Sequence, residues 1–161
     1  ETVVESILGE YNEGEAPTAQ GGVIPRGLFR LETLDLWFES FNLGIATVDP
    51  TMSYYQGVGA LSIDETGIFK LDMQGEANLT SEQGAQFMRA VQLTFGGQMS
   101  SSAGIGLDPP EGESAITISL DCPQEQDVEM NYTATEDRMT IFLSFNDPVS
   151  GIQVMTFVKA Q

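Results

Sequence analysis

Histidine is absent from this 161-residue chain, and cysteine occurs only once, as Cys122. A single cysteine cannot form an intramolecular disulfide. Without histidine there is no Ser-His-Asp triad, no Cys-His dyad and no haem histidine ligand, and the usual zinc sites built from His and Cys are excluded. Cys122 has no base or cation close to it in sequence, which favours a structural thiol over a nucleophile. The sequence therefore predicts neither a metal site nor a cofactor.

Basic residues are also scarce. Six lysines and arginines face 24 acidic residues, which gives a formal net charge of -18. A nucleic-acid-binding protein needs clustered cations to displace the counterions of the phosphates, and an anionic membrane surface makes a similar demand. The sequence therefore excludes nucleic acid and anionic membrane surfaces as expected partners. The six cations lie singly, at Arg26, Arg30, Lys70, Arg89, Arg138 and Lys159.

Long apolar runs are missing as well. No run reaches the roughly 20 residues that a membrane-spanning helix requires. The chain begins at Glu1 without an initiator methionine, so we expect that an upstream segment, either a signal peptide or a tag, was removed. A removed signal peptide would imply a secreted or periplasmic protein, and the sequence does not distinguish the two cases.

What the chain does contain is alternation of apolar and polar residues, with a hydrophobic content of 41%. A period of two residues is typical of strands that bury one face. Three such segments follow one another between Ser114 and Val158 and predict an antiparallel meander. Their apolar positions are Ile116, Ile118 and Leu120, then Val128, Met130, Tyr132 and Ala134, then Met139, Ile141, Leu143 and Phe145.

Further strands are predicted on both sides of this meander. The segments 54–63 and 68–76 flank Asp64-Glu65-Thr66-Gly67, a short turn ending in glycine, and so predict a hairpin. In its second arm Phe69 and Met73 share one face. Alternation also predicts a strand over 91–95, a weak continuation over 98–106, and a closing strand over 152–159.

Two segments, 3–10 and 28–41, allow competing interpretations, and a third, 81–89, is predicted as a helix. Thr2 and Glu5 form a capping-box pattern that predicts a short helix over 3–10, and a strand starting at 8–11 is the alternative. A second capping-box pattern predicts a short helix over 81–89. The segment 28–41 fits either a strand or a helix face, and its aromatic residues favour the strand.

The segment 12–27 contains two prolines and little periodicity, and it predicts a long loop. Loops of this length are often lids or binding loops, although a mobile connection is an equal alternative. The whole chain, 1–161, is expected to form one domain. Its fold class is predicted as all-β: a single antiparallel up-and-down β-barrel of about eight to ten strands with a short N-terminal helix.

With its meander, the chain resembles the calycin group, which includes the lipocalins. Lipocalins usually carry Gly-x-Trp near the first strand and a late arginine that packs across the tryptophan. Here Gly9-Glu10-Tyr11 and Lys159 stand in comparable places. The resemblance implies an eight-stranded barrel that holds one small apolar ligand. The architecture is also similar to that of allene oxide cyclase-like barrels and other small barrel cyclases, which act on hydrophobic substrates without a metal or nucleotide.

These observations give two functional expectations. The first is a protein that binds a small hydrophobic molecule inside the barrel; the alternative is a cofactor-independent cyclase or isomerase on the same scaffold, so the sequence leaves enzymatic activity open. A third reading is a barrel whose interior is simply filled. No catalytic residue is predicted. The candidate ligand-binding residues are Trp37, Tyr54, Tyr55, Phe69, Met73, Phe95, Met130, Tyr132 and Phe145.

Overall fold

A computed structural model describes residues 7–13, 15–38, 54–81, 83–84, 86–100, 105–107, 113–122, 125–145 and 151–160. In these ranges the chain forms strands and turns, and none of them contains a helix able to cross a bilayer. The strands are β1 (Ile7–Glu13), β2 (Gly27–Phe38), β3 (Tyr54–Ile63), β4 (Ile68–Thr80), β5 (Gln86–Ser100), β6 (Ala115–Cys122), β7 (Gln126–Thr135), β8 (Arg138–Phe145) and β9 (Gly151–Lys159).

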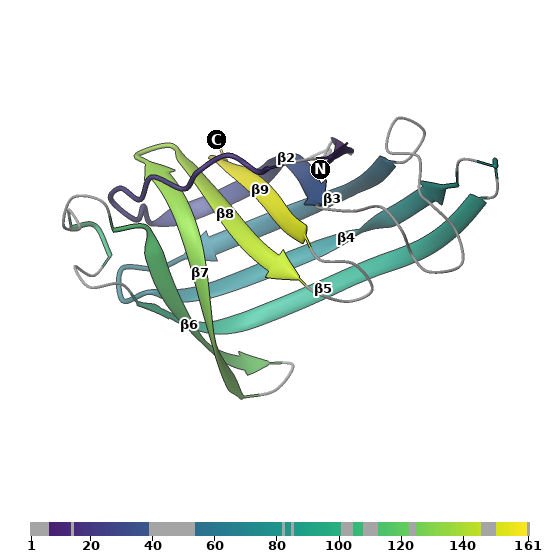
Figure 1. Cartoon of the computed structure of the whole chain (residues 1–161). Helices are drawn as coiled ribbons and strands as arrows, with labels where there is room; N and C mark the ends of the chain where they lie inside the picture. Colours follow the sequence, from purple (N-terminus) through teal and green to yellow (C-terminus); the bar gives the residue numbers. More distant parts are fainter. Residues whose placement is uncertain are drawn as a thin grey trace.

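Strands β2 to β9 form a closed antiparallel barrel of eight strands (Figure 1). Each strand pairs with the next one along the chain, and β2 also pairs with β9 from Phe29 to Phe38, which closes the sheet on itself. The all-β class and the single antiparallel barrel predicted from alternation are therefore confirmed. The meander from Ser114 onward forms β6, β7, β8 and β9 as expected.

Strand β1 is a ninth strand wedged between β2 and β3. These two neighbours pair directly only where Gly27–Arg30 meets Ala60–Ile63. Beyond that point β1 fills the gap, parallel to β2 and antiparallel to β3. Residues 7–10 of the expected N-terminal helix are therefore strand, because they find hydrogen-bonding partners on both sides; residues 3–6 lie outside the described ranges.

Strand β2 resolves the ambiguity of 28–41 in favour of a strand over 28–38, with residues 39–41 outside the described ranges. A bulge shifts its register with β9 between Leu31 and Thr33. The extra residue lets Leu31 and Leu34 both face the core, at 3% and 1% exposure. For that reason their spacing of three residues resembles that of a helix face. The bulge also bends the strand, as closure of the barrel requires.

The connection between β4 and β5 corrects the second helix prediction. Residues 86–89 belong to β5, whose pairing with β4 runs along the whole length of β4. A turn joins the two strands, with the amide of Gly84 donating to the carbonyl of Ser81 at 2.9 Å. Gly84 has a positive φ of 89°, which ends any helical run. β5 then extends through 98–100 of the expected weak strand, and Ile105–Gly106 is a turn.

The predicted hairpin between β3 and β4 is confirmed, and Asp64 organises its turn. One carboxylate oxygen of Asp64 accepts hydrogen bonds from the Thr66 amide and hydroxyl and from the Ile68 amide, at 2.8–3.0 Å. The Thr66 hydroxyl bond is the main cause that lowers the pKa of Asp64. This turn lies at the same end of the barrel as the start of β2, because Ile63 pairs with Gly27.

Gly97 allows β5 and β6 to approach closely at a register shift. A Cβ atom built at Gly97 would lie 2.0 Å from the carbonyl oxygen of Ser119 and 3.0 Å from Cα of Leu120. Both are backbone atoms, which cannot move aside as a flexible side chain would.

We therefore predict that Gly97→Ala lowers the free energy of unfolding by roughly 1 to 3 kcal/mol, the usual cost of overpacking. Thr94→Ala, at an exposed position of the same strand, should cost less than about 1 kcal/mol. Urea denaturation of both variants measures the difference. Equal small losses would show that the two strands are not in this close contact.

Candidate functional site

The interior of the barrel is divided into a packed end and a looser end. At the packed end Phe29, Met139 and Phe157 are completely buried. They lie together because of the strand register. Met139 pairs with Phe157, and Lys159, two residues after Phe157, pairs with Phe29. Towards the other end the inward residues Phe95, Val128, Met130 and Leu143 are only half-buried. Side chains therefore fill the packed end and leave space that begins beside Leu61, the partner of Phe29, and extends towards the half-buried residues.

That space is an apolar cavity of about 170 Å³. The described part of its wall contains four methionines and two phenylalanines, and Gln126 is the one polar residue there. A methionine side chain adapts its shape readily, so the wall can adjust around an occupant. The lining residues are Leu61, Phe69, Leu71, Met73, Phe95, Met99, Ile118, Leu120, Gln126, Val128, Met130, Ile141, Leu143 and Met155.

Four of the nine candidate residues line this cavity: Phe69, Met73, Phe95 and Met130. They come from three strands, β4, β5 and β7, and alternation brings them to one interior face. The other lining residues were not singled out from the sequence. Most of them lie at the predicted inward positions of the meander and the hairpin. Extending the alternating pattern to every inward position of these strands would have identified them.

The remaining candidates do not line the cavity or lie outside what the structure describes. Trp37 is half-buried on β2, opposite Ile152 of β9. Tyr54 is 41% exposed, and its hydroxyl accepts a hydrogen bond from Nδ2 of Asn78 at 3.3 Å. Tyr55 and Phe145 belong to β3 and β8, but their side chains are outside the described set.

Tyr132 is buried at the packed end, where it holds the segment 15–26 rather than lining the cavity. Its hydroxyl donates to the carbonyl of Gly22 at 2.8 Å. Its backbone carbonyl accepts from the amide of Gly21, whose own carbonyl accepts from the amide of Ala134, both at 2.8 Å. In the sequence this segment connects β1 to β2. In the structure it runs beside β7, with Gly21 and Thr133 forming a parallel bridge.

The close contact with β7 depends on two glycines. Gly21 and Gly22 have positive φ angles of 71° and 123°, which side-chain-bearing residues rarely adopt. A Cβ at Gly22 would lie 2.2 Å from the carbonyl oxygen of Ala134. After this contact Ile24 is 1% exposed and joins the hydrophobic core. The segment thus closes the packed end of the barrel with an apolar side chain.

No metal centre forms in the part of the chain that the structure describes: its His, Cys, Asp and Glu residues make no group of three or more suited to a metal ion. Comparison with known proteins adds no relative. No family model matches the sequence, and no curated protein or solved structure gave a match. The geometry of the barrel is therefore the basis for proposing a function.

We predict that Tyr132→Phe loosens the closure of the packed end. The variant lacks the bond to Gly22 and leaves that carbonyl without this donor, which should cost about 1 to 2 kcal/mol of unfolding free energy. Hydrogen exchange should become faster at the amides of Gly21 and Ala134 and stay unchanged at Asp64, in the β3–β4 turn. If the substitution changed exchange equally at Gly21, Ala134 and Asp64, Tyr132 would not hold this segment locally.

The same hydroxyl predicts an alkaline transition. Burial raises the pKa of Tyr132 above its ordinary value, and the charge of Glu113 raises it further. The unfolded chain therefore releases this proton first, so the stabilising contribution is complete below about pH 10 and is lost as pH rises through the folded-state pKa. Thermal unfolding followed from pH 9 to 12 should show a steeper fall for the wild type than for Tyr132→Phe.

Proposed function

We propose that this barrel binds one small, neutral, hydrophobic molecule in its interior. The observation that carries the proposal is the apolar cavity of about 170 Å³ in the barrel interior. An unfilled cavity of that volume would cost on the order of 4 kcal/mol at about 24 cal/mol per Å³. That is a large part of the stability of an ordinary domain, so an occupant that fills the space gives it a physical purpose.

The cavity volume sets the size of the occupant. A dry cavity of about 150 Å³ accommodates benzene. The present volume thus suits a molecule of about six to ten non-hydrogen atoms, such as a single or fused aromatic ring. This is below the usual range of ligand pockets, about 300 to 1,000 Å³, although the four methionines could adjust for a somewhat larger guest.

The strand register also supports the likeness to lipocalins, at positions other than those expected from the sequence. Tyr11 pairs with Leu36, far from the last residues of β9. Lys159 instead pairs with Phe29, in the tripeptide Gly27-Leu28-Phe29 at the start of β2. A Cβ at Gly27 would lie 3.5 Å from Cε of Lys159 and 3.9 Å from the Phe29 ring. This Gly-x-aromatic sequence beside a late cation is the better counterpart of the lipocalin pattern.

The cyclase alternative has less support from the cavity wall. Stabilising charge that develops during a reaction requires polar groups aimed at the reacting atoms. Among the described lining residues only Gln126 is polar, and Trp37, Tyr54 and Tyr132, which were considered for that role, are not part of the lining. A binding role needs no such groups, because burial of apolar surface supplies the affinity.

The proposal predicts that Leu71→Phe blocks the interior, because the larger side chain projects into the cavity. Binding of indole or benzene, measured by calorimetry, should weaken at least about tenfold, as a loss of 1.4 kcal/mol implies. Ile68→Phe is the matched control: it lies on the same strand, is 55% exposed, and should bind as the wild type does.

Thermal unfolding without ligand separates blocking from misfolding. Leu71→Phe should keep or raise the melting temperature, since the new side chain fills empty space. If the wild type binds neither probe at millimolar concentration, or if a folded Leu71→Phe binds them equally well, the interior is not a binding site.

A further inference from the structure

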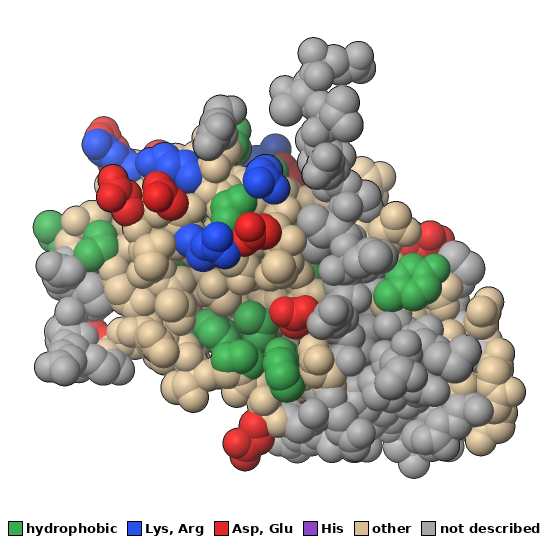
Figure 2. All heavy atoms as spheres, turned by 90° about the horizontal axis from the view of Figure 1, so that it is seen from above, with side chains coloured by type: hydrophobic (Ala, Val, Ile, Leu, Met, Phe, Trp, Pro, Cys, Tyr) green, Lys and Arg blue, Asp and Glu red, His purple; other side chains and the backbone are tan. Residues whose placement is uncertain are grey.

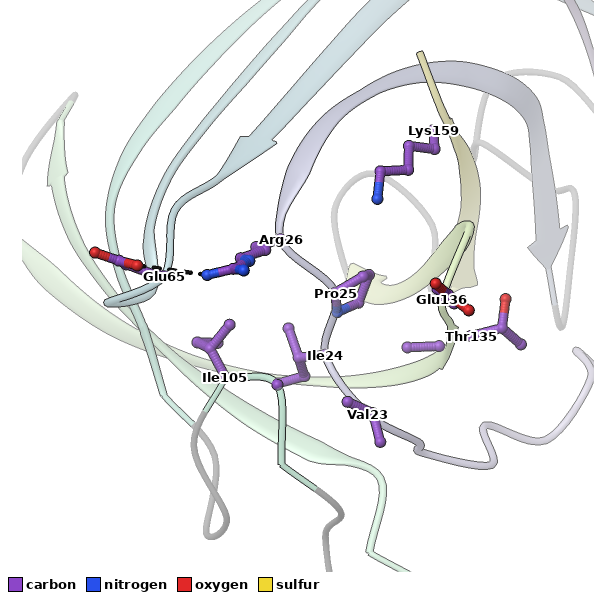
Figure 3. Close-up of a pocket in the computed structure, with 11 residues that line it drawn as sticks. Val23, Ile24, Pro25, Arg26, Glu65, Ile105, Thr135, Glu136 and Lys159 are labelled. Atoms are coloured by element: carbon purple, nitrogen blue, oxygen red, sulfur yellow. Dashed lines mark hydrogen bonds and ion pairs between the residues drawn. The ribbon is translucent and has the colours of Figure 1, made fainter. Parts of the chain in front are cut away.

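A second hollow lies at the packed end of the barrel, outside the interior (Figure 3). We call it the end pocket. Its volume is about 760 Å³, and none of its described lining residues also lines the interior cavity. Ile24, which lines it, is also part of the core that closes this end. The residues that line the end pocket are Val23, Ile24, Pro25, Arg26, Glu65, Ile105, Gly106, Ala134, Thr135, Glu136 and Lys159.

One side of the end pocket is apolar. Val23, Ile24 and Pro25 come from the segment that closes the barrel, and Ile105 comes from the turn after β5. A hydrogen bond from the amide of Gly106 to the carbonyl of Ile24, at 3.0 Å, joins these two pieces of chain. The apolar wall is thus built from segments that the fold fixes to each other.

An exposed apolar residue follows this wall in the sequence. Leu107 comes directly after Gly106 of the pocket lining and is 62% exposed. Apolar surface left in water around a hollow favours a ligand with an apolar body.

The other side of the end pocket carries two of the six cations of the chain. Lys159 has no carboxylate partner among the residues that the structure describes. Its amine is directed toward the space near Pro25 in Figure 3. Arg26 contacts Glu65 at 3.4 Å, with both side chains at least 70% exposed, and such a pair contributes at most about 1 kcal/mol. Arg26 can therefore exchange Glu65 for another anion at small cost.

This placement is unusual for a chain with a net charge of -18. Figure 2 shows the described Lys and Arg side chains gathered at one end of the face in view, with acidic side chains among them. The distant acids repel an anion only weakly, since the Debye length is about 8 Å at physiological ionic strength. At contact, the nearby charges decide: Lys159 and Arg26 attract an anion, while Glu136 and Glu65, which lines the pocket beside Arg26, oppose it.

We propose that the end pocket binds an amphipathic organic anion. Lys159, assisted by Arg26, holds a single carboxylate, and the apolar body of the ligand lies against Ile24, Pro25 and Ile105. The site is separate from the interior and would exist even if the barrel bound nothing inside.

The test compares decanoate with decanol, which share a chain length and differ in charge. Calorimetry on the wild type should show that decanoate binds more tightly. Lys159→Gln should weaken decanoate binding about tenfold, the worth of one charge-assisted hydrogen bond, and leave decanol unchanged. Lys70→Gln, which removes a cation paired with Asp72 on β4, is the control and should have no effect.

Two further variants make the outcome decisive. Glu136→Gln should strengthen decanoate binding, because it removes one of the two opposing charges of the pocket, and Glu65 keeps the other. A gain of affinity cannot come from misfolding. Leu71→Phe, which alters only the interior, should leave decanoate binding as it is. The proposal is overturned if the wild type does not prefer decanoate, if Lys159→Gln binds it normally, or if Leu71→Phe abolishes its binding.

Discussion

The pairing of β2 with β9 is the constraint on which this structure depends. It joins the first and last barrel strands over ten residues of β2, from Phe29 to Phe38. Without it both strands would present free edges, and the interior would open to water. The bulge between Leu31 and Thr33 supports this closure, because it bends β2 while both flanking leucines remain in the core. Closure of the sheet thus creates the enclosed space that a binding function requires.

The two ends of the barrel then differ for a simple reason. At one end a chain segment returns across the opening, fastened to β7 by Tyr132 and inserting Ile24 into the core. At the other end the inward residues are only half-buried, and β3, β4 and β5 extend past the short strands (Figure 1). The closing segment fills the packed end and forms one wall of the end pocket, whereas side chains pack less completely at the looser end.

Much of this fold could be predicted from the sequence because alternation records which face of a strand is buried. It placed Phe69, Met73 and Met130 on the interior face. Alternation could not show that a bulge turns both Leu31 and Leu34 towards the core. The extra residue gives these leucines a spacing of three, which is also the spacing of a helix face. At β1 a helix was preferred and the strand was kept only as the alternative, and the turn at Gly84 was missed. In both cases local capping patterns favoured helices, whereas pairing with distant strands decided the structure. The cavity volume depends on how all side chains pack together, which periodicity does not encode.

The central claim is that the closed barrel encloses apolar space that a guest can occupy. Crystallography of the protein under xenon pressure tests this claim most directly, because xenon enters dry apolar cavities without needing polar partners. The account predicts a xenon peak inside the barrel, bounded by Phe69, Met99 and Leu120. A barrel interior filled by side chains, with no xenon within it, would contradict the account.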